Sequence, residues 1–275
     1  MSERQKGKGI MNYEGKALTI AGSDSGGGAG IQADLKTFAA FNVYGMSVIA
    51  SVTAQNTVGV RAIHDIPPEM VAEQIEAVME DIGVDAAKTG MLSNSRIIEI
   101  VADKIKKYHL GKLVIDPVMV AKGGSLLLKE EARATLVEEL LPLAYVVTPN
   151  LFEAEIISGI SVTSIEDAEK AALLIYEKGP KNVLVKGGHL SATKPTDVLF
   201  DGSEYHYYQS ERIDTKNTHG TGCTLSAAIT ALLAKGLDLK SAVEIARGYI
   251  FRAIKEAPSD IGKGYGPLYH NVKSG

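Results

Sequence analysis

The sequence predicts a single three-layer α/β/α domain, in which helices cover both faces of a mostly parallel central sheet. Short β-branched runs alternate with longer helical stretches almost from end to end. No linker, fixed-period repeat or low-complexity tract interrupts this alternation. At 275 residues and 45% apolar content, the chain is long enough to bury the core of one large domain. We expect residues 13–275 to form this domain and residues 1–12, which lack the apolar stretch of a secretory signal, to be a disordered leader.

The strands are predicted from short runs rich in β-branched residues. These runs cover 17–21, 47–53, 85–89, 113–118, 145–148 and 183–186. Two further runs, 198–200 and 204–208, flank the turn signal Asp201-Gly202-Ser203, which predicts an antiparallel hairpin at an edge of the sheet. The helices are predicted from longer stretches with apolar residues at helical spacing. They cover 32–41, 69–82, 95–108, 129–141, 165–178, 221–235 and 239–257.

Composition argues against several classes of partner. The formal net charge of -4 and the pI near 5.9 leave no basic excess to neutralise a phosphate backbone, so we expect no nucleic-acid binding. The single cysteine cannot form a disulfide within the chain, and the longest apolar runs fall short of the roughly 20 residues that a membrane span needs. We therefore expect a cytoplasmic protein without a membrane partner.

Ligands of doubly wound sheets bind beyond the carboxyl ends of the strands, so the residues that follow each predicted strand are the first candidates for a site. These positions are rich in glycine and polar side chains. They are Gly22-Ser23-Asp24, Thr53-Ala54-Gln55-Asn56, Lys88-Thr89-Gly90-Met91, Asp116-Pro117, Thr148-Pro149-Asn150 and Lys186-Gly187-Gly188-His189.

A glycine-containing turn leads into the predicted helix 221–235. Gly220 and Gly222 let the backbone turn sharply, and the free N–H groups of a helix start then attract an anion. This pattern favours a phosphate cradle, although a turn of this kind also occurs as a packing solution only.

Cys223 lies in the first turn of the same helix. The helix dipole lowers the pKa of a thiol at this position, which makes it a usable base or nucleophile at neutral pH. The alternative interpretation is a small buried apolar residue.

Two acidic residues follow predicted strands. Asn150 and Glu153 fit a capping box at a helix start, with Asn150 as the N-cap. Asp116 precedes Pro117 and is either a turn residue or a candidate metal ligand.

These segments, together with residues 21–37, closely resemble the hydroxymethylpyrimidine and phosphomethylpyrimidine kinases of thiamine synthesis, which form a vitamin-kinase branch of the ribokinase-like superfamily. The resemblance covers nearly all of the chain from Lys16 onward. Many sugar kinases of the superfamily carry an aspartate where this sequence has Cys223, so the cysteine favours the vitamin-kinase branch. The matching segments are 54–56, 88–92, 116–119, 148–153, 186–189, 217–224 and 262–267.

The resemblance implies a homodimeric kinase that uses ATP and Mg²⁺ to convert 4-amino-5-hydroxymethyl-2-methylpyrimidine to its monophosphate and then to the diphosphate. Cys223 would take the hydroxymethyl proton, and Gly220, Thr221 and Gly222 would form the anion hole. An aminopyrimidine offers donors and acceptors along one edge that a carboxylate and an amide can pair. The implied pyrimidine ligands are Gly22, Asp34, Gln55, Met91 and Val118; the implied ATP ligands are Asn150, Lys186 and Thr218; the implied magnesium ligands are Asp116 and Glu153.

Other activities remain open at this point. A pyridoxal or pyridoxine kinase of vitamin B6 salvage is the nearest, because both substrates are rings that bear a hydroxymethyl group. An NAD-binding oxidoreductase is more remote: residues 28–33 fit G-x-G-x-x-A, but residues 51–53 at the end of the second strand offer no ribose-binding acid. A non-catalytic nucleotide-binding regulator would keep the fold and lose the base.

Overall fold

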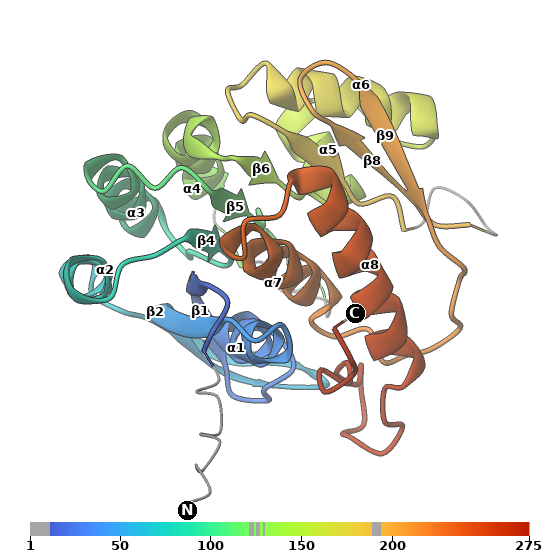
Figure 1. Ribbon diagram of the computed structural model, residues 1–275, viewed down its shortest axis with the longest axis horizontal. Coiled ribbons are helices and arrows are strands. Elements are labelled where there is room, and N and C mark those ends of the chain that lie inside the picture. Colours follow the sequence, from blue (N-terminus) through green and yellow to red (C-terminus); the bar gives the residue numbers. More distant parts are fainter. Residues whose placement is uncertain (1–11, 121–123, 125–126, 129, 189–193, 275) are drawn as a thin grey trace, which may run out of the picture.

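The computed structural model of the chain describes residues 12–120, 124, 127–128, 130–188 and 194–274. The predicted leader, apart from Asn12, therefore lies outside the described residues, and so does His189. Figure 1 shows the arrangement of the helices and strands along the chain.

The described strands form one nine-stranded sheet in the order β3-β2-β1-β4-β5-β6-β7-β8-β9. The pairs from β2 through β7 are parallel, whereas β3, β8 and β9 are paired antiparallel at the two edges. The predicted edge hairpin is confirmed as β8 and β9. The bounds are β1 Lys16–Asp24, β2 Tyr44–Asn56, β3 Gly59–Asp65, β4 Ala86–Thr89, β5 Leu113–Ile115, β6 Val146–Val147, β7 Val183–Val185, β8 Thr196–Phe200 and β9 Tyr205–Gln209.

Strand β3 is absent from the sequence-based prediction. It pairs antiparallel with β2 at the edge of the sheet, and all of its side chains are half-buried or exposed. Because neither face of β3 is buried, its sequence lacks the apolar alternation by which strands are recognised. Its position depends on tertiary pairing with β2 and not on local pattern.

Helices cover both faces of the sheet, as predicted (Figure 1). Within the part of the chain that the structure describes, no helix is long and apolar enough to cross a membrane. The predicted helix 129–141 is only partly α-helical, because α4 continues as a π-helical turn at Leu136–Leu140 and a 3-10 turn at Leu141–Leu143. The bounds are α1 Gly30–Ala40, α2 Pro68–Asp81, α3 Ser95–Lys107, α4 Glu130–Thr135, α5 Leu151–Ser158, α6 Ile165–Tyr176, α7 Thr221–Ala234 and α8 Leu239–Lys255.

Successive residues of the central strands pack into two separate cores, one on each face of the sheet. Ala17 packs with apolar residues of α1, α7 and α8, whereas its neighbour Leu18 packs with residues of α2 to α6. Ala86 and Ala87 of β4 divide in the same way. This division follows from the two-residue period of a strand, whose successive side chains point to opposite faces.

The chain enters the sheet at β1, which pairs with β2 on one side and with β4 on the other. Strands β2 and β3 are thus added on one side of β1, whereas the chain from β4 onward is added on the other side, so the strand order reverses between β1 and β4. Open α/β sheets bind ligands in the crevice that such a reversal creates beyond the carboxyl ends of the strands. Thr19 of β1 lies opposite Lys88 of β4 at this point.

A C-terminal segment closes the structure against α7 and α8. The Tyr249 hydroxyl donates a hydrogen bond to the backbone oxygen of His270 at 2.7 Å, and the Thr224 hydroxyl lies 3.0 Å from Nε2 of His270. Burial lowers the pKa of His270 to about 4, so the ring is neutral at physiological pH. The same segment reaches the loop before α7, where the N–H of His219 donates to the oxygen of Gly266 at 3.0 Å.

We expect Tyr249→Phe to lower the free energy of unfolding by about 1–2 kcal/mol, because it leaves the buried oxygen of His270 without its donor. Tyr207→Phe is the matched control, since Tyr207 is 50% exposed and its hydroxyl bonds to an exposed carboxylate of Glu169. Urea denaturation of both variants measures the difference. Equal stability of the two variants would contradict the anchoring role of Tyr249.

Candidate active site

Helix α7 begins at Gly220 in a conformation that only glycine can adopt there. Its φ of +82° is left-handed, and a Cβ at this position would collide with the backbone oxygen of Gly28. Among the described residues, no side chain caps this helix start. The N–H groups of Gly222 and Cys223 precede the first intrahelical hydrogen bonds, so they are oriented to bind an anion.

A buried ion pair lies against this helix start. Nζ of Lys186, which follows β7, is 2.9 Å from Oδ1 of Asp116, which follows β5. A Cβ added to Gly222 would lie 3.3 Å from that Nζ and 3.7 Å from Oδ2 of Asp116. Burial by itself lowers the pKa of Lys186, but Asp116 and Glu153 raise it above its usual range. A charged ammonium therefore stands beside the backbone that is oriented toward an anion.

Asn150 and Glu153 form the capping box that their spacing predicts. The Asn150 side chain accepts from the N–H of Glu153 at 2.9 Å, and the Glu153 carboxylate accepts from the N–H of Asn150 at 2.8 Å. Glu153 is 3% exposed. Burial and the like charge of Asp116 raise its pKa to about 7, although Lys186 and backbone N–H groups act in the opposite direction.

Asp116 and Glu153 also fit a hard cation. Their carboxylates repel each other, which contributes to the raised pKa of Glu153, and a divalent cation relieves such repulsion. Magnesium commonly binds through one or two carboxylates together with water and substrate phosphates. In the described part of the chain, no cluster of three or more His, Cys, Asp or Glu side chains suits a metal.

Four of the residues that the resemblance assigns to the pyrimidine lie at or just after the carboxyl ends of β1, β2, β4 and β5. The N–H of Gly22 donates to the oxygen of Met91 at 3.1 Å, and a Cβ on Gly22 would lie 2.9 Å from Cε of Met91. Gln55 is half-buried near the end of β2, and Val118 is half-buried just after Asp116. Four of the five predicted ligands therefore lie at the same edge of the sheet.

The fifth, Asp34, has different contacts from those predicted. Its side chain is fully buried, and its two carboxylate oxygens lie 2.9 and 3.0 Å from Nζ of Lys88. The Thr19 hydroxyl donates to the same carboxylate at 2.6 Å. The Asp34 carboxylate is therefore enclosed by Lys88 and Thr19 and is not exposed at the edge of the sheet.

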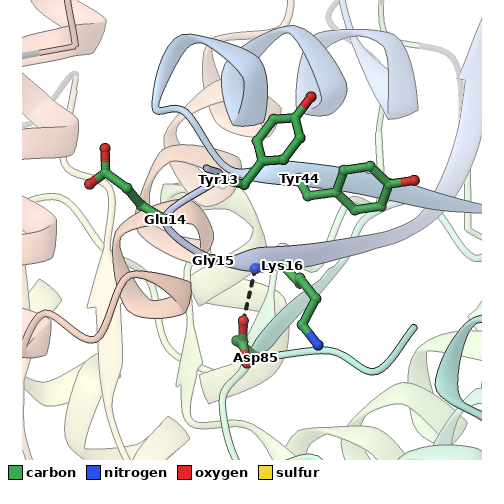
Figure 2. Close-up of a pocket in the computed structure, with 6 residues that line it drawn as sticks. All are labelled: Tyr13, Glu14, Gly15, Lys16, Tyr44 and Asp85. Carbon is green, nitrogen blue, oxygen red and sulfur yellow. Dashed lines mark hydrogen bonds between the residues drawn. The ribbon is translucent and has the colours of Figure 1, made fainter. Parts of the chain in front are cut away.

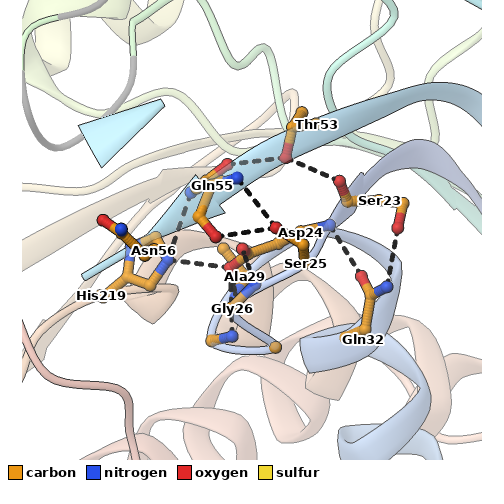
Figure 3. Close-up of polar contacts among 12 residues, drawn as sticks. Ser23, Asp24, Ser25, Gly26, Ala29, Gln32, Thr53, Gln55, Asn56 and His219 are labelled. Atoms are coloured by element: carbon orange, nitrogen blue, oxygen red, sulfur yellow. Dashed lines mark hydrogen bonds and ion pairs between the residues drawn. The ribbon is translucent and has the colours of Figure 1, made fainter. Parts of the chain in front are cut away.

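A polar network that the sequence does not reveal joins the loops after β1 and β2 to the loop before α7 (Figure 3). Nε2 of His219 lies 2.9 Å from Oδ2 of Asp24 and 3.3 Å from Nε2 of Gln55. Asp24 also accepts from the N–H groups of Gly26 and Ala29, each at 2.8 Å. Burial raises the pKa of Asp24, but these partners outweigh that effect and lower it. The network holds Gln55 beside the phosphate cradle.

The surroundings of Cys223 correct the predicted direction of its pKa. The dipole argument predicts a lowered value, but burial raises the pKa of the thiol to about 11. Lys88 and the N–H of Gly30 act to lower it, whereas Asp116 and Asp34 raise it further. The loss of hydration therefore outweighs the favourable position at the helix start.

A hollow of about 490 Å³ lies at the opposite end of the sheet. Figure 2 shows the residues that line it. It lies at the amino ends of β1 and β2, where the N–H of Lys16 donates to Asp85 at 2.8 Å. None of the predicted site residues lines it. The lining residues are Tyr13, Glu14, Gly15, Lys16, Tyr44 and Asp85.

Comparison with known proteins identifies the family of this chain. Residues 24–269 match the family model described as phosphomethylpyrimidine kinase, a range that includes α7 and the ion pair beside it. The chain belongs to the phosphomethylpyrimidine kinase family. It is 50% identical over 256 residues to the hydroxymethylpyrimidine/phosphomethylpyrimidine kinase of Bacillus subtilis (strain 168), covering 93% of this chain and 94% of that relative.

Two solved structures are similar over most of the molecule. The phosphomethylpyrimidine kinase of Clostridium difficile 630 has a TM-score of 0.79 and 48% identity, with 87% of this chain and 99% of that chain covered. The pyridoxal kinase of Bacillus subtilis, solved as an ADP complex, has a TM-score of 0.86 and 44% identity, with 94% and 98% covered. The predicted kinase class and ribokinase-like fold are thus confirmed.

Glu153→Gln tests the electrostatics of the site, because glutamine retains the capping box but does not titrate. The pKa of Glu153 in the folded protein, about 7, lies above its usual value of 4.5, so wild-type stability is lost as pH rises between these values. We expect the variant to gain free energy of unfolding relative to wild type from about pH 5 to about pH 8 in denaturation experiments. A difference that does not change with pH would contradict the raised pKa.

Proposed function

We propose that the protein phosphorylates the hydroxymethyl group of 4-amino-5-hydroxymethyl-2-methylpyrimidine with ATP, and then extends the monophosphate to the diphosphate with a second ATP. The observation that carries this proposal is the start of α7, where the half-buried Cys223 adjoins uncapped N–H groups. The chain also belongs to a family whose relatives bear both kinase names. We further propose that residues 13–275 act as one kinase domain.

The geometry suits phosphoryl transfer. This reaction requires chiefly that the reacting groups be held in line and that donors surround the equatorial oxygens of the transferred group. We propose that the backbone of Gly220, Thr221 and Gly222 supplies such donors together with the N–H of Cys223, and Lys186 offers a charge beside them. Of these, the Thr221 N–H already donates to the oxygen of Thr218 at 3.4 Å. Thr218 lies in the same loop, where its oxygen accepts from the Thr221 hydroxyl at 2.9 Å. We propose that Lys186, Thr218 and Asn150 bind the nucleotide.

Magnesium is the cofactor that suits the acidic pair. We propose that Asp116 and Glu153 hold it, with Glu153 acting through water because its carboxylate already accepts backbone N–H groups. When bound, the ion would neutralise negative charge on the phosphates. The role of Glu153 as a helix cap is compatible with this arrangement.

The pyrimidine would lie against Gly22, Met91 and Val118, with Gln55 on its polar edge. An amide presents one donor and one acceptor side by side, which matches the amino group and ring nitrogen of an aminopyrimidine. His219 and Thr53 contact the two polar atoms of Gln55, at 3.3 and 3.2 Å, and so limit its rotation. Because Asp34 is enclosed, we assign it no contact with the ring.

The two phosphorylation steps differ in what they require of Cys223. An alcohol must lose its proton during attack, whereas a phosphate monoester with a second pKa of roughly 6 is already largely ionised at neutral pH. In its thiolate form, Cys223 would accept the hydroxymethyl proton and become a thiol as the bond from oxygen to phosphorus forms and ADP leaves. It has no proton to accept in the second step.

We therefore expect Cys223→Ala to slow the first step by about 100-fold or more and the second step much less. Thr230→Ala is the control, because it removes a polar side chain of the same helix, whose hydroxyl donates to the backbone oxygen of Ser226. Single-turnover measurements with each substrate, followed by mass analysis of the products, give both rates. Equal losses in the two steps would contradict the role of Cys223 as the base.

Phosphorylation of pyridoxal is a second candidate activity, favoured by the 44% identity to a pyridoxal kinase structure. Hydroxymethylpyrimidine, its monophosphate, pyridoxal and ribose can be assayed in parallel with magnesium and ATP. We expect conversion of the first two to the diphosphate, with pyridoxal as a slower substrate and ribose as the negative control. Turnover of pyridoxal alone would overturn the proposed substrate while leaving the fold and the chemistry of Cys223 in place.

We also propose a cytoplasmic homodimer. The exposed edge of the sheet formed by β2 and β3 carries Val52, Val58 and Ile63, which are 45%, 67% and 39% exposed, and apolar surface of this kind suits a protein interface. We expect sedimentation to give a dimer and Ile63→Lys to shift it toward monomer without loss of fold. A monomeric wild-type protein would contradict the dimer.

A further inference from the structure

Asp197, near the start of strand β8, is a buried carboxylate that joins three parts of the fold. It is 4% exposed, and the residues that follow it in β8, Val198 and Leu199, are buried and apolar. One carboxylate oxygen of Asp197 contacts the Arg247 guanidinium of α8, and the other accepts from the N–H of Gly187 at 2.9 Å. The side chain therefore links α8 and the edge hairpin to the loop after β7.

The loop after β7 carries the ammonium that stands beside the start of α7. Gly187 directly follows Lys186, whose Nζ lies 2.9 Å from Oδ1 of Asp116. The N–H of Lys186 donates to the oxygen of Pro149 at 2.8 Å, whereas the N–H of Gly187 donates to Asp197. Two successive N–H groups are thus bonded to different segments, one after β6 and one in β8. These two bonds fix the backbone from which the Lys186 side chain extends.

Backbone pairing between β7 and β8 ends before Gly187. The last residue of β7 in this register is Val185, and Lys186 instead forms a bridge with Asn150 on the side of β6. Gly187 is buried, so its N–H needs a partner within the protein. The side chain of Asp197, and not the backbone of β8, supplies that partner.

Fold stability alone does not require a charge at this position. A neutral side chain can accept from an N–H group, and replacing a buried ion pair by apolar residues of similar volume is often neutral or stabilising. Arg247 is itself largely buried, and its second terminal nitrogen donates to the Ser210 hydroxyl at 3.2 Å. The guanidinium and the N–H of Gly187 therefore hold the carboxylate through its two oxygens, which fixes the acceptor in place.

We propose that Asp197 is a positioning residue for the nucleotide. Its carboxylate, held by Arg247, fixes the backbone of Gly187 and so keeps the Lys186 ammonium at the start of α7, where the terminal phosphate of ATP would bind. A displaced ammonium would attract that phosphate less, because Coulomb interaction falls with distance. The inference rests on the proposed nucleotide role of Lys186.

Two double variants separate the acceptor from the ion pair. Asp197→Leu/Arg247→Met removes the acceptor and leaves no unpaired buried charge. Asp197→Asn/Arg247→Met removes the same charges but keeps an acceptor for the N–H of Gly187. Calorimetry with magnesium and a non-hydrolysable ATP analogue measures the dissociation constant without turnover. We expect the leucine variant to bind the analogue at least about tenfold more weakly than wild type, and the asparagine variant to stay within about threefold.

ADP distinguishes a displaced ammonium from a general distortion of the nucleotide site. ADP lacks the terminal phosphate, so we expect its affinity to fall by less than about threefold in the leucine variant. In turnover, the KM for ATP should rise alike in both phosphorylation steps, because both use the same nucleotide. Lys104→Met/Glu76→Gln is the matched control, since it removes an ion pair between α2 and α3, and we expect it to leave both nucleotide affinities unchanged.

A leucine variant that binds the analogue as tightly as wild type would overturn the proposal. An asparagine variant as weak as the leucine variant would also overturn it, and so would equal losses for ADP and the analogue. Asp197→Ala/Arg247→Met removes the same acceptor and carries the same prediction if the leucine variant does not fold. A wild-type protein that binds no ATP analogue would instead overturn the proposed kinase function, so the two failures are distinguishable.

Discussion

The close contact between Gly220 and Gly28 is the constraint on which the rest of the site depends. Gly220 begins α7 in a left-handed conformation, and a side chain there would collide with the backbone of the loop after β1. This contact brings the start of α7 to the point where the strand order reverses between β1 and β4. His219 and Asp24 strengthen it through a hydrogen bond of 2.9 Å between Nε2 of His219 and Oδ2 of Asp24 (Figure 3). The phosphate cradle and the edge that would bind the ring are thereby held together.

Buried charge is the second determinant of the site. Asp34 and Asp116 each contact a lysine. The Glu153 carboxylate instead accepts hydrogen bonds from backbone N–H groups and is attracted by the charge of Lys186. Burial would otherwise favour the neutral forms of all these groups. Their mutual compensation keeps positive charge beside the anion-binding backbone. An active site that transfers phosphate needs such fixed charges, because they require no rearrangement when the transition state forms.

Local pattern predicted most of the fold and part of the site. The alternation of strands and helices, the hairpin of β8 and β9 and the capping box all arise from residues close in sequence. Strand β3 was missed because it buries neither face, and the role of Asp34 was missed because its partner Lys88 is 54 residues away. The direction of the Cys223 pKa depends on burial, which a helix-start pattern does not encode. Predictions failed where tertiary contacts, and not local sequence, determine the outcome.

The most direct measurement is a crystal structure of the protein with hydroxymethylpyrimidine, magnesium and a non-hydrolysable ATP analogue. We expect the hydroxymethyl oxygen within hydrogen-bond reach of the Cys223 sulfur, and the terminal phosphate on the N–H groups of Gly222 and Cys223. A pyrimidine bound elsewhere, or a terminal phosphate remote from the start of α7, would contradict the proposal that phosphoryl transfer occurs at this helix start.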